Sequence, residues 1–186
     1  MLPSTALPDA AIVEPIAQAV KADRVTSLAT VLRELTAGGA FENPALFAPA
    51  RTDRYVRRLL WRDRDDRFVI VAMTWNAGQQ TPLHDHGGLW GAEIVVTGTM
   101  REQNFRIVER DAGGAARFAR EPDLTLTERT VGFLVPPYDH HAYANVGESV
   151  AHTVHVYTGP LETCIAYSPA GGDWWTGEKH ALAYDA

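Results

Sequence analysis

The chain has 186 residues, of which 46% are hydrophobic and 22% charged, and its formal net charge is −6, which is typical of one acidic globular domain. The acidic balance argues against nucleic acids and anionic membranes as partners, and no apolar run approaches the ~20 residues of a membrane span. A single cysteine excludes a disulfide framework, and the absence of a basic segment before the first apolar stretch predicts a cytoplasmic protein without a secretory signal.

The first part of the chain, residues 1–54, is predicted to be helical. Asp9 is a candidate N-cap for a first segment with apolar residues at helical spacing. Residues 25–36 form a second such segment, and the glycine pair at 38–39 is expected to end it. Residues 43–54 contain two prolines and predict a short helix or a loop.

After residue 54 the hydrophobic pattern changes to period two. The predicted strands are 68–75, 92–97, 100–108, 116–119, 124–128, 132–135 and 150–157. Short strands in such number, without helices between them, favour an antiparallel sandwich or barrel. We therefore expect a mainly β single domain over residues 1–186, with a barrel at 55–168 and an irregular C-terminal cover at 169–186.

Histidines form the most informative pattern. His84 and His86 are two residues apart in an extended run, so both side chains point to one face. A third histidine follows about 55 residues later, as either His140 or His141. Neutral imidazoles are good ligands for iron, zinc, copper or nickel. The pattern predicts a metal site, although His-Asp-His can also be a polar loop without one.

Two segments resemble the motifs of the cupin superfamily. The pattern Gly-x5-His-x-His at 78–86, followed by Gly98, resembles the first cupin motif, and Pro-x4-His-x3-Asn at 136–145 resembles the second. The narrower resemblance, over about residues 50–168, is to bacterial members of the cysteine dioxygenase (thiol dioxygenase) family. Three further segments carry it: Tyr-Val-Arg at 55–57, Thr-Val-His-Val-Tyr at 153–157 and Leu-Glu-Thr-Cys at 161–164.

This resemblance implies a jelly-roll-like cupin barrel after a helical N-terminal segment, and a mononuclear non-haem Fe(II). By the family's motifs the iron ligands are His84, His86 and His141. His141 is preferred to His140 because it precedes Asn145 by four residues. The implied reaction oxidises the thiol of a small mercapto acid, cysteine-like or 3-mercaptopropionate-like, to a sulfinic acid with O2.

The family also implies a hydrogen-bonded relay along one strand. Tyr157 is expected to donate to bound oxygen or substrate, His155 to orient Tyr157, and Thr153 to replace the family's serine. Without the resemblance, the three are ordinary cross-strand polar residues. Gly91 stands where the eukaryotic enzymes have a cysteine cross-linked to the tyrosine, so no thioether is expected here.

Three other residues are candidates for the substrate pocket or its walls. Arg57 can bind a carboxylate bidentately, with Tyr55 on the same face, but it also lies in a run of arginines that solvent could surround. Trp90 is expected to wall the pocket or to be a core residue. Cys164 is expected in the core.

Glu93 departs from the family, which usually has an apolar residue there. It shares strand parity with Gly91 and is therefore predicted to point inward. A buried carboxylate needs a partner, and three are considered: the metal, an arginine such as Arg57, or the substrate. Outward exposure through a bulge is the alternative to an inward position.

Two other functions are compatible with the cupin motifs. The first is a different metal-dependent enzyme, an isomerase or a carbon-cleaving dioxygenase, which ligation by Glu93 would favour. The second is a non-catalytic cupin that binds a small ligand. The expected partners under the favoured interpretation are a small thiol carboxylate and O2, with neither nucleic acid nor membrane.

Overall fold

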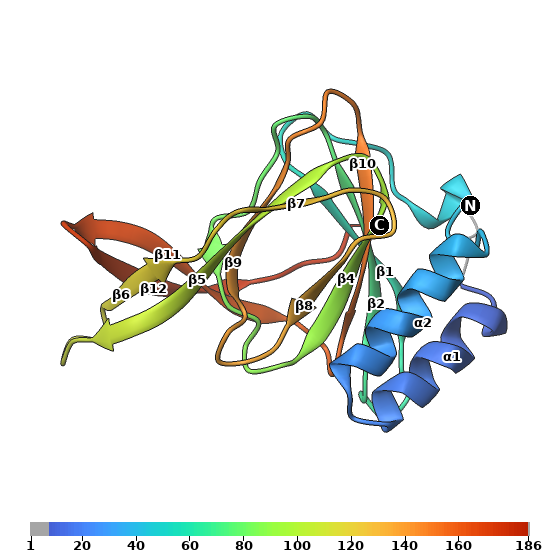
Figure 1. Ribbon diagram of the computed structural model, residues 1–186, viewed down its shortest axis with the longest axis horizontal. Helices are drawn as coiled ribbons and strands as arrows, with labels where there is room; N and C mark the ends of the chain where they lie inside the picture. The colour runs from blue at the N-terminus through green and yellow to red at the C-terminus, as the bar shows by residue number, and fades with distance from the viewer. Residues whose placement is uncertain (1–7, 186) are drawn as a thin grey trace.

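The computed structural model describes residues 8–185, which form two antiparallel β-sheets with two α-helices packed against one of them (Figure 1). Residues 1–7 and 186, which belong to the predicted helical part and C-terminal cover, lie outside the described residues. The helical elements are α1 (Ala10–Lys21), α2 (Val25–Ala37) and the short 3-10 helix η1 (Pro44–Leu46). Neither α-helix within residues 8–185 is long and apolar enough to cross a membrane.

The strands divide between sheet A and sheet B. Sheet A contains β1 (Val56–Arg62), β2 (Val69–Trp75), β4 (Gly91–Thr97), β8 (Val131–Leu134) and β10 (Ala151–Tyr157), in the order β1-β2-β10-β4-β8. Sheet B contains β3 (Leu83–His84), β5 (Met100–Arg110), β6 (Ala116–Arg120), β7 (Leu124–Leu126), β9 (His140–Asn145), β11 (Thr163–Gly171) and β12 (Trp174–Ala181), in the order β6-β12-β11-β3-β9-β5-β7.

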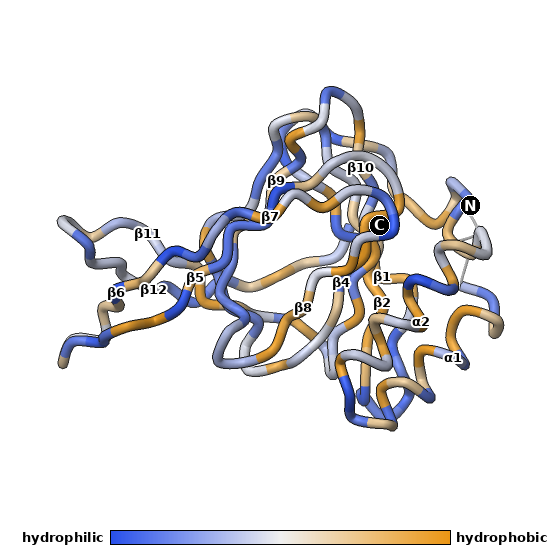
Figure 2. Tube along the Cα trace, in the orientation of Figure 1, coloured by the Kyte–Doolittle hydropathy of each residue, from blue (hydrophilic) through white to orange (hydrophobic). Residues whose placement is uncertain are grey.

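The two helices cover the outer face of sheet A because each carries one apolar face. Asp9 caps α1 as predicted, since its side chain accepts a hydrogen bond from the backbone N of Ala11 at 3.2 Å. Ile16 and Leu32 are fully buried in the cluster shared with this sheet, and Figure 2 shows hydrophobic and hydrophilic residues alternating around both helices. α2 ends at the predicted glycine pair, where Gly39 has a φ of +79° that glycine adopts readily.

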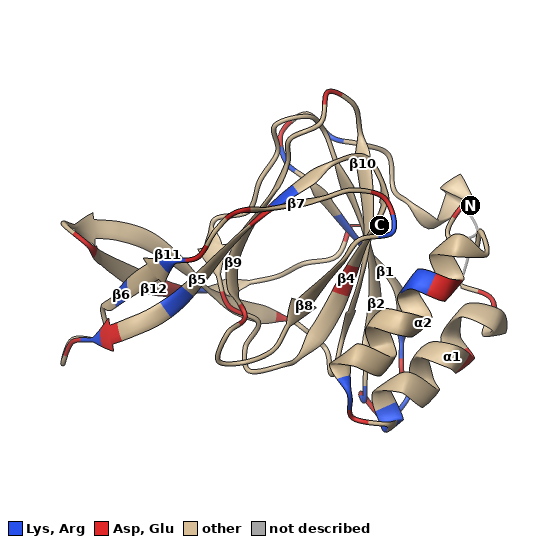
Figure 3. Ribbon diagram, in the orientation of Figure 1, with Lys and Arg blue, Asp and Glu red and all other residues tan. Residues whose placement is uncertain are grey.

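The central strands of sheet A are buried on both faces, because one face meets the helices and the other faces sheet B. In β10, Val154 and Val156 pack towards the helices, whereas Thr153, His155 and Tyr157 face the interior between the sheets. Figure 3 shows that most charged residues lie instead in loops, at element ends and on the strands that project from the body. As a result of this packing, the polar side chains of β10 lie between the two sheets, inside the molecule.

The prediction that residues 169–186 form an irregular cover is wrong for most of this segment. β11 continues to Gly171, and after a tight turn β12 pairs with it in antiparallel register to form a hairpin at one end of the molecule (Figure 1). Gly177 permits this pairing, because a Cβ there would lie 2.6 Å from Ile165 Cγ2 and 2.9 Å from Tyr167 Cε1. Only residues 182–185 are irregular, and they return across β1.

The other predicted strands agree with the structure except at their limits. The predicted run at 124–128 is shorter, since β7 ends at Leu126 and the chain turns at Glu128–Arg129. Strands β1, β3, β9, β11 and β12 were absent from the predicted runs, because short or mixed polar segments show little period-two signal. Two of these, β3 and β9, carry histidines of the predicted metal site.

Candidate metal centre and active-site pocket

Three histidines meet in the interior between the sheets. His84 on β3 lies directly opposite His141 on β9, and His86 follows β3. The ring centroids are 4.9 Å apart for His84–His86, 4.8 Å for His84–His141 and 4.9 Å for His86–His141. The rings therefore stand at the corners of a nearly equilateral triangle, with one ring nitrogen of each within 4.8 Å of those of the others.

The hydrogen bonds of the three rings leave their Nε2 atoms free for a metal. His84 Nδ1 lies 3.0 Å from the carbonyl oxygen of Pro82, and His86 Nδ1 lies 3.0 Å from that of Asp139. His141 Nδ1 lies 3.4 Å from Glu102 Oε1. Carbonyl and carboxylate oxygens only accept, so each Nδ1 is the protonated nitrogen and each Nε2 keeps its lone pair.

Burial favours the ligand form of the first two histidines. It lowers the pKa of His84 well below the usual value and also lowers that of His86, so both rings are neutral near pH 7. His86 Nε2 is buried and has no hydrogen-bond partner within the described residues. An orphaned, unprotonated nitrogen at the centre of three imidazoles fits a bound transition-metal ion.

His141 has a different electrostatic environment. Burial lowers its pKa, but the hydrogen bond to Glu102 and the charge of Glu93 outweigh burial, so the pKa is raised. Glu102 is itself only 2% exposed and was missed by the sequence analysis. The sequence signal that could have identified it is its position two residues after the buried Met100 on the same strand, which places both side chains on one face. The carboxylate orients the His141 ring and strengthens it as a ligand, as is common for metal-binding histidines.

The structure brings His141, and not His140, to the other two histidines. Adjacent residues of a strand point to opposite faces, and the His140 ring accordingly lies among Phe118 and Tyr167, at 5.6 and 5.7 Å between centroids. Asn145 does not reach the triangle. Its amide donates to the carbonyl oxygens of Trp75 and Ser149 at the end of β9.

The loop that carries His86 is held by its own backbone contacts. Asp85, between the two histidines, points to the opposite side, and its Oδ1 accepts from the backbone N of Ile165 at 2.8 Å and of Gly87 at 3.2 Å. Gly87 and Gly88 then turn the chain towards β4 with φ values of +61° and +82°. These contacts fix both histidines on one side of the loop.

The predicted relay residues lie in a hydrogen-bonded line on β10. Thr153 Oγ1 is 2.8 Å from His155 Nε2, and His155 Nδ1 is 3.2 Å from the Tyr157 hydroxyl. Trp75 extends the line, since its indole N–H donates to Thr153 Oγ1 at 3.0 Å. The Tyr157 ring stacks on His86, with 5.7 Å between centroids. Burial raises the pKa of Tyr157, so its hydroxyl stays protonated at neutral pH.

Gly91 allows β4 to approach this line closely. It pairs with Tyr157, and a Cβ at position 91 would lie 2.3 Å from the carbonyl oxygen of Val156. Any side chain there would force the two strands apart. With glycine at this position there is no sulfur for a thioether to Tyr157.

A cavity of about 250 Å³ is bordered by two of the three clustered histidines, by two residues of the relay and by Arg57. Its wall includes His84, His141, His155, Tyr157, Tyr55, Arg57, Glu93, Leu161, Cys164 and Leu182. Burial raises the pKa of Cys164 to about 11, so this residue remains a thiol in the cavity wall. The volume is below the ~300–1,000 Å³ of pockets for drug-sized ligands, which indicates a small substrate.

Trp90 does not wall this cavity. It precedes the inward-facing Gly91 and so points the other way, against the helix-covered side of sheet A. There it borders a surface hollow with Val20 and Phe68. Its carbonyl oxygen accepts from the backbone N of Thr158 at 2.9 Å. The prediction of a pocket wall is therefore wrong: Trp90 is partly buried and packs at the edge of the cluster between the helices and sheet A.

Arg57 is separated from the exposed arginines around it. It is 7% exposed, whereas Arg54 is exposed. Its Nη1 donates to the carbonyl oxygen of Ala183 at 3.3 Å, its guanidinium lies 5.1 Å from the centre of the Tyr184 ring, and its Nη2 has no partner within the described residues. The free Nη2 is a donor available to an anion in the cavity. Tyr55 is also in the wall and stacks on Trp75 at 4.6 Å.

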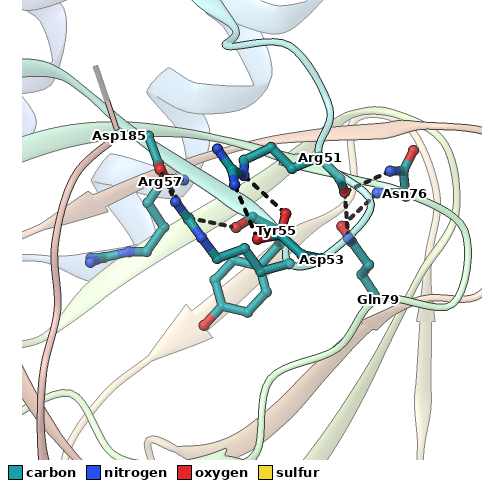
Figure 4. Close-up of polar contacts among 8 residues, drawn as sticks. Arg51, Asp53, Tyr55, Arg57, Asn76, Gln79 and Asp185 are labelled. Carbon is teal, nitrogen blue, oxygen red and sulfur yellow. Dashed lines mark hydrogen bonds and ion pairs between the residues drawn. The ribbon is translucent and has the colours of Figure 1, made fainter.

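The C-terminal segment, residues 182–185, holds this arginine in place. Asp185 Oδ2 accepts from the backbone N of Arg57 at 3.1 Å and from Arg54 Nη1 at 2.9 Å. The backbone N of Asp185 donates in turn to the carbonyl oxygen of Arg57 at 2.7 Å. Figure 4 shows Asp185 against the start of β1, beside Arg57 and above Tyr55. These contacts were not predicted, because residues 182–185 belong to the part expected to be an irregular cover.

Glu93 points inward as predicted, and its nearest basic neighbour within the described residues is His155 rather than the arginine that was considered. It is 0% exposed and lies opposite His155 in the β4–β10 register, with Oε2 3.0 Å from His155 Nδ1. Burial raises the pKa of Glu93, but the neighbouring charges of His155 and His141 outweigh burial and lower it. Glu93 is therefore a buried carboxyl group beside the relay, and neither of its oxygens has a hydrogen-bond partner within the described residues.

Comparisons with known proteins agree with this arrangement. The sequence profile described as cysteine dioxygenase type I matches residues 3–170. Cysteine dioxygenase type 1 of Rattus norvegicus is 24% identical over 180 residues, covering 88% of this chain and 86% of the relative. The human protein of that name is 22% identical over 139 residues, covering 74% and 65%.

Solved structures with a similar fold are more distant. A Klebsiella pneumoniae protein with a double-stranded β-helix domain is 14% identical, with a TM-score of 0.47 over 60% of this chain and 78% of the other. The cupin domain of Cnp3 from Schizosaccharomyces pombe is 11% identical, with a TM-score of 0.45 over 61% and 65%. The family match and the observed sheets together confirm the expected mainly β, cupin-type fold with an N-terminal helical segment.

Proposed function

The chain belongs to the cysteine dioxygenase type I family, and we propose that it is a non-haem iron thiol dioxygenase acting on a small mercapto acid in the cytoplasm. One observation carries the proposal: a cluster of three imidazoles, two of which border a small cavity, shares that cavity with a protonated tyrosine and with an arginine nitrogen that has no partner within the described residues. In the reaction both atoms of O2 are added to the thiol sulfur, giving a sulfinic acid.

The metal would be held by His84, His86 and His141. Three neutral ligands leave the ion its full positive charge, and the Nδ1 contacts of the rings keep each Nε2 directed at it. Fe(II), when bound, supplies the one-electron chemistry between dioxygen and sulfur and lowers the pKa of the thiol.

The protein's own groups position the substrate. The free Nη2 of Arg57 is suited to the substrate carboxylate, because a charge-assisted hydrogen bond can form there at a buried guanidinium in the cavity wall. Tyr184 and the Ala183 carbonyl fix the guanidinium plane. Tyr157 holds a proton at its hydroxyl oxygen, and its stacking on His86 keeps that hydroxyl beside the metal ligands.

Oxygen uptake with a panel of thiols tests the function. With iron-loaded protein we expect one O2 consumed per sulfinate formed from cysteine, 3-mercaptopropionate or a related mercapto acid. Cysteamine, which lacks the carboxylate for Arg57, should react much more slowly. Iron-loaded protein that consumes no O2 with any of these thiols would overturn the proposal and favour a different cupin enzyme or a ligand-binding cupin.

Replacement of Tyr157 by phenylalanine is expected to lower kcat by about 10²-fold, the lower end for loss of a proton-transferring side chain. Iron content should stay at the wild-type level, because the hydroxyl is not one of the ligands. Steady-state oxygen uptake and metal analysis measure the two quantities. Tyr138→Phe, at a tyrosine 64% exposed, is the matched control and should retain full activity. A wild-type kcat in Tyr157→Phe would remove the hydroxyl from the mechanism.

A further inference from the structure

Of the three clustered histidines, His86 is the one that lies outside the β-strands. His84 and His141 are opposite each other on the paired strands β3 and β9, so the sheet fixes both backbones. β3 ends at His84, and Gly87 and Gly88 turn the chain immediately after His86. The position of the His86 ring therefore depends on contacts other than strand pairing.

Asp139, the residue directly before β9, makes these contacts in two ways. Its side-chain Oδ2 accepts a hydrogen bond from the backbone N of His86 at 3.1 Å, and its backbone carbonyl oxygen lies 3.0 Å from His86 Nδ1. Oδ2 is also 3.4 Å from the same Nδ1. The side chain of Asp139 thus holds the backbone of His86, while the carbonyl group sets the rotation of the His86 ring.

The contact between Asp139 and His86 is buried and joins the two segments that carry the histidines. Asp139 is 3% exposed and His86 is 1% exposed, and a buried backbone N–H that loses its acceptor is costly. The two residues are 53 positions apart in the chain, and Asp139 precedes His141 by only two residues. The contact therefore sets the spacing of the His86 and His141 rings, whose centroids are 4.9 Å apart.

We infer that Asp139 is a positioning residue of the metal centre, which holds His86 at the third corner of the histidine triangle by accepting the hydrogen bond of its backbone N–H. The inference rests on the proposed metal centre and not on the reaction catalysed there. Without this side chain, the carbonyl group of residue 139 would still accept from the ring, but the loop of His86 would no longer be tied to the start of β9. Metal binding should therefore weaken although all three ligands remain.

Anaerobic titration of the metal-free, full-length protein with Co(II), followed by visible absorption, tests this role. Asp139→Ala should raise the Kd for Co(II) about 10- to 100-fold, the range for residues that hydrogen-bond to metal ligands. Asp139→Asn should bind Co(II) nearly as tightly as the wild type, because its amide oxygen still accepts from the His86 N–H.

Asp63 supplies a matched control in the turn between β1 and β2. It is also buried, at 7% exposed, and its Oδ2 accepts from the backbone N of Asp65 at 3.1 Å and of Arg67 at 3.3 Å. Asp63→Ala should lower the thermal stability of the protein, because it removes the same kind of backbone contact, but it should leave the Kd for Co(II) unchanged.

An unchanged Kd in a folded Asp139→Ala protein would overturn the inference, and so would an equal loss of affinity in Asp139→Asn. If the alanine variant does not fold, amide hydrogen exchange in the metal-free wild type decides. The His86 N–H should be protected, and exchange as fast as that of an exposed loop amide would show that Asp139 does not hold it. A wild type that binds no Co(II) would contradict the proposed metal centre and this inference with it. Co(II) binding as expected, but no thiol oxidation by the iron-loaded enzyme, would contradict the proposed reaction alone.

Discussion

Replacement of His86 by alanine is expected to abolish iron retention, leaving the purified protein with less than about a tenth of the wild-type iron per chain. Mutation of a residue that hydrogen-bonds to a metal ligand typically weakens metal binding by about 10–100-fold. Removal of a ligand itself should weaken metal binding more than this. His86 is 1% exposed and its Nε2 has no other partner within residues 8–185, so no neighbouring group replaces it. His84→Ala should behave in the same way. Metal analysis after gel filtration measures the loss.

The pair His140 and His141 supplies a matched control for this result. Both rings are buried and adjacent in sequence, but only His141 lies in the triangle, while His140 packs among aromatic rings. His141→Ala should lose iron, and His140→Ala should keep it even if it is less stable. Full iron in His141→Ala together with loss in His140→Ala would show that the third ligand is wrongly assigned.

Replacement of Arg57 by alanine is expected to raise KM for a mercapto acid and to lower kcat/KM by about 30- to 4,000-fold. This range corresponds to the ~2–5 kcal/mol lost when one partner of a desolvated, hydrogen-bonded charge pair is removed. Arg57 has the required burial, at 7% exposed, and a free Nη2 in the cavity wall. Initial rates over a range of substrate concentrations separate KM from kcat.

Two controls separate carboxylate binding from a loss of structure. Cysteamine lacks the carboxylate, so its slow oxidation should be unaffected by Arg57→Ala. Arg58→Ala removes the neighbouring guanidinium, which donates to the carbonyl oxygen of Ala45 on the far side of the strand, and should leave KM unchanged. An unaltered KM for the acid in Arg57→Ala would mean that the carboxylate binds elsewhere.

The clustering of the candidate metal ligands could be predicted in part, because local spacing places two of them on one face. Two residues that are two positions apart on an extended segment point to the same face, and this rule places His84 beside His86 without any knowledge of the fold. His141 was chosen because it precedes Asn145 by four residues in a motif. In the structure, the Asn145 side chain makes hydrogen bonds at the end of β9 and does not contact the histidines. The strand rule also predicted that Glu93 points inward.

The partners of these residues could not be predicted, because they depend on pairing between distant segments. Glu93 meets His155 only through the β4–β10 register, which joins residues 62 positions apart, as 155 minus 93 shows. The sequence of β12, which begins with two tryptophans, has no period-two signal, and its pairing with β11 is fixed by the turn and by Gly177. Trp90 was assigned to the pocket from proximity to His86 rather than from strand parity.

Residues 182–185, which fix Arg57 against β1, lie beyond the part of the chain that matches the family profile, residues 3–170. The imidazoles and the relay lie within that part. Substitutions among residues 182–185 can therefore shift the guanidinium of Arg57 while His84, His86 and His141 stay in place. The position of this arginine thus depends on a segment that the family profile does not describe.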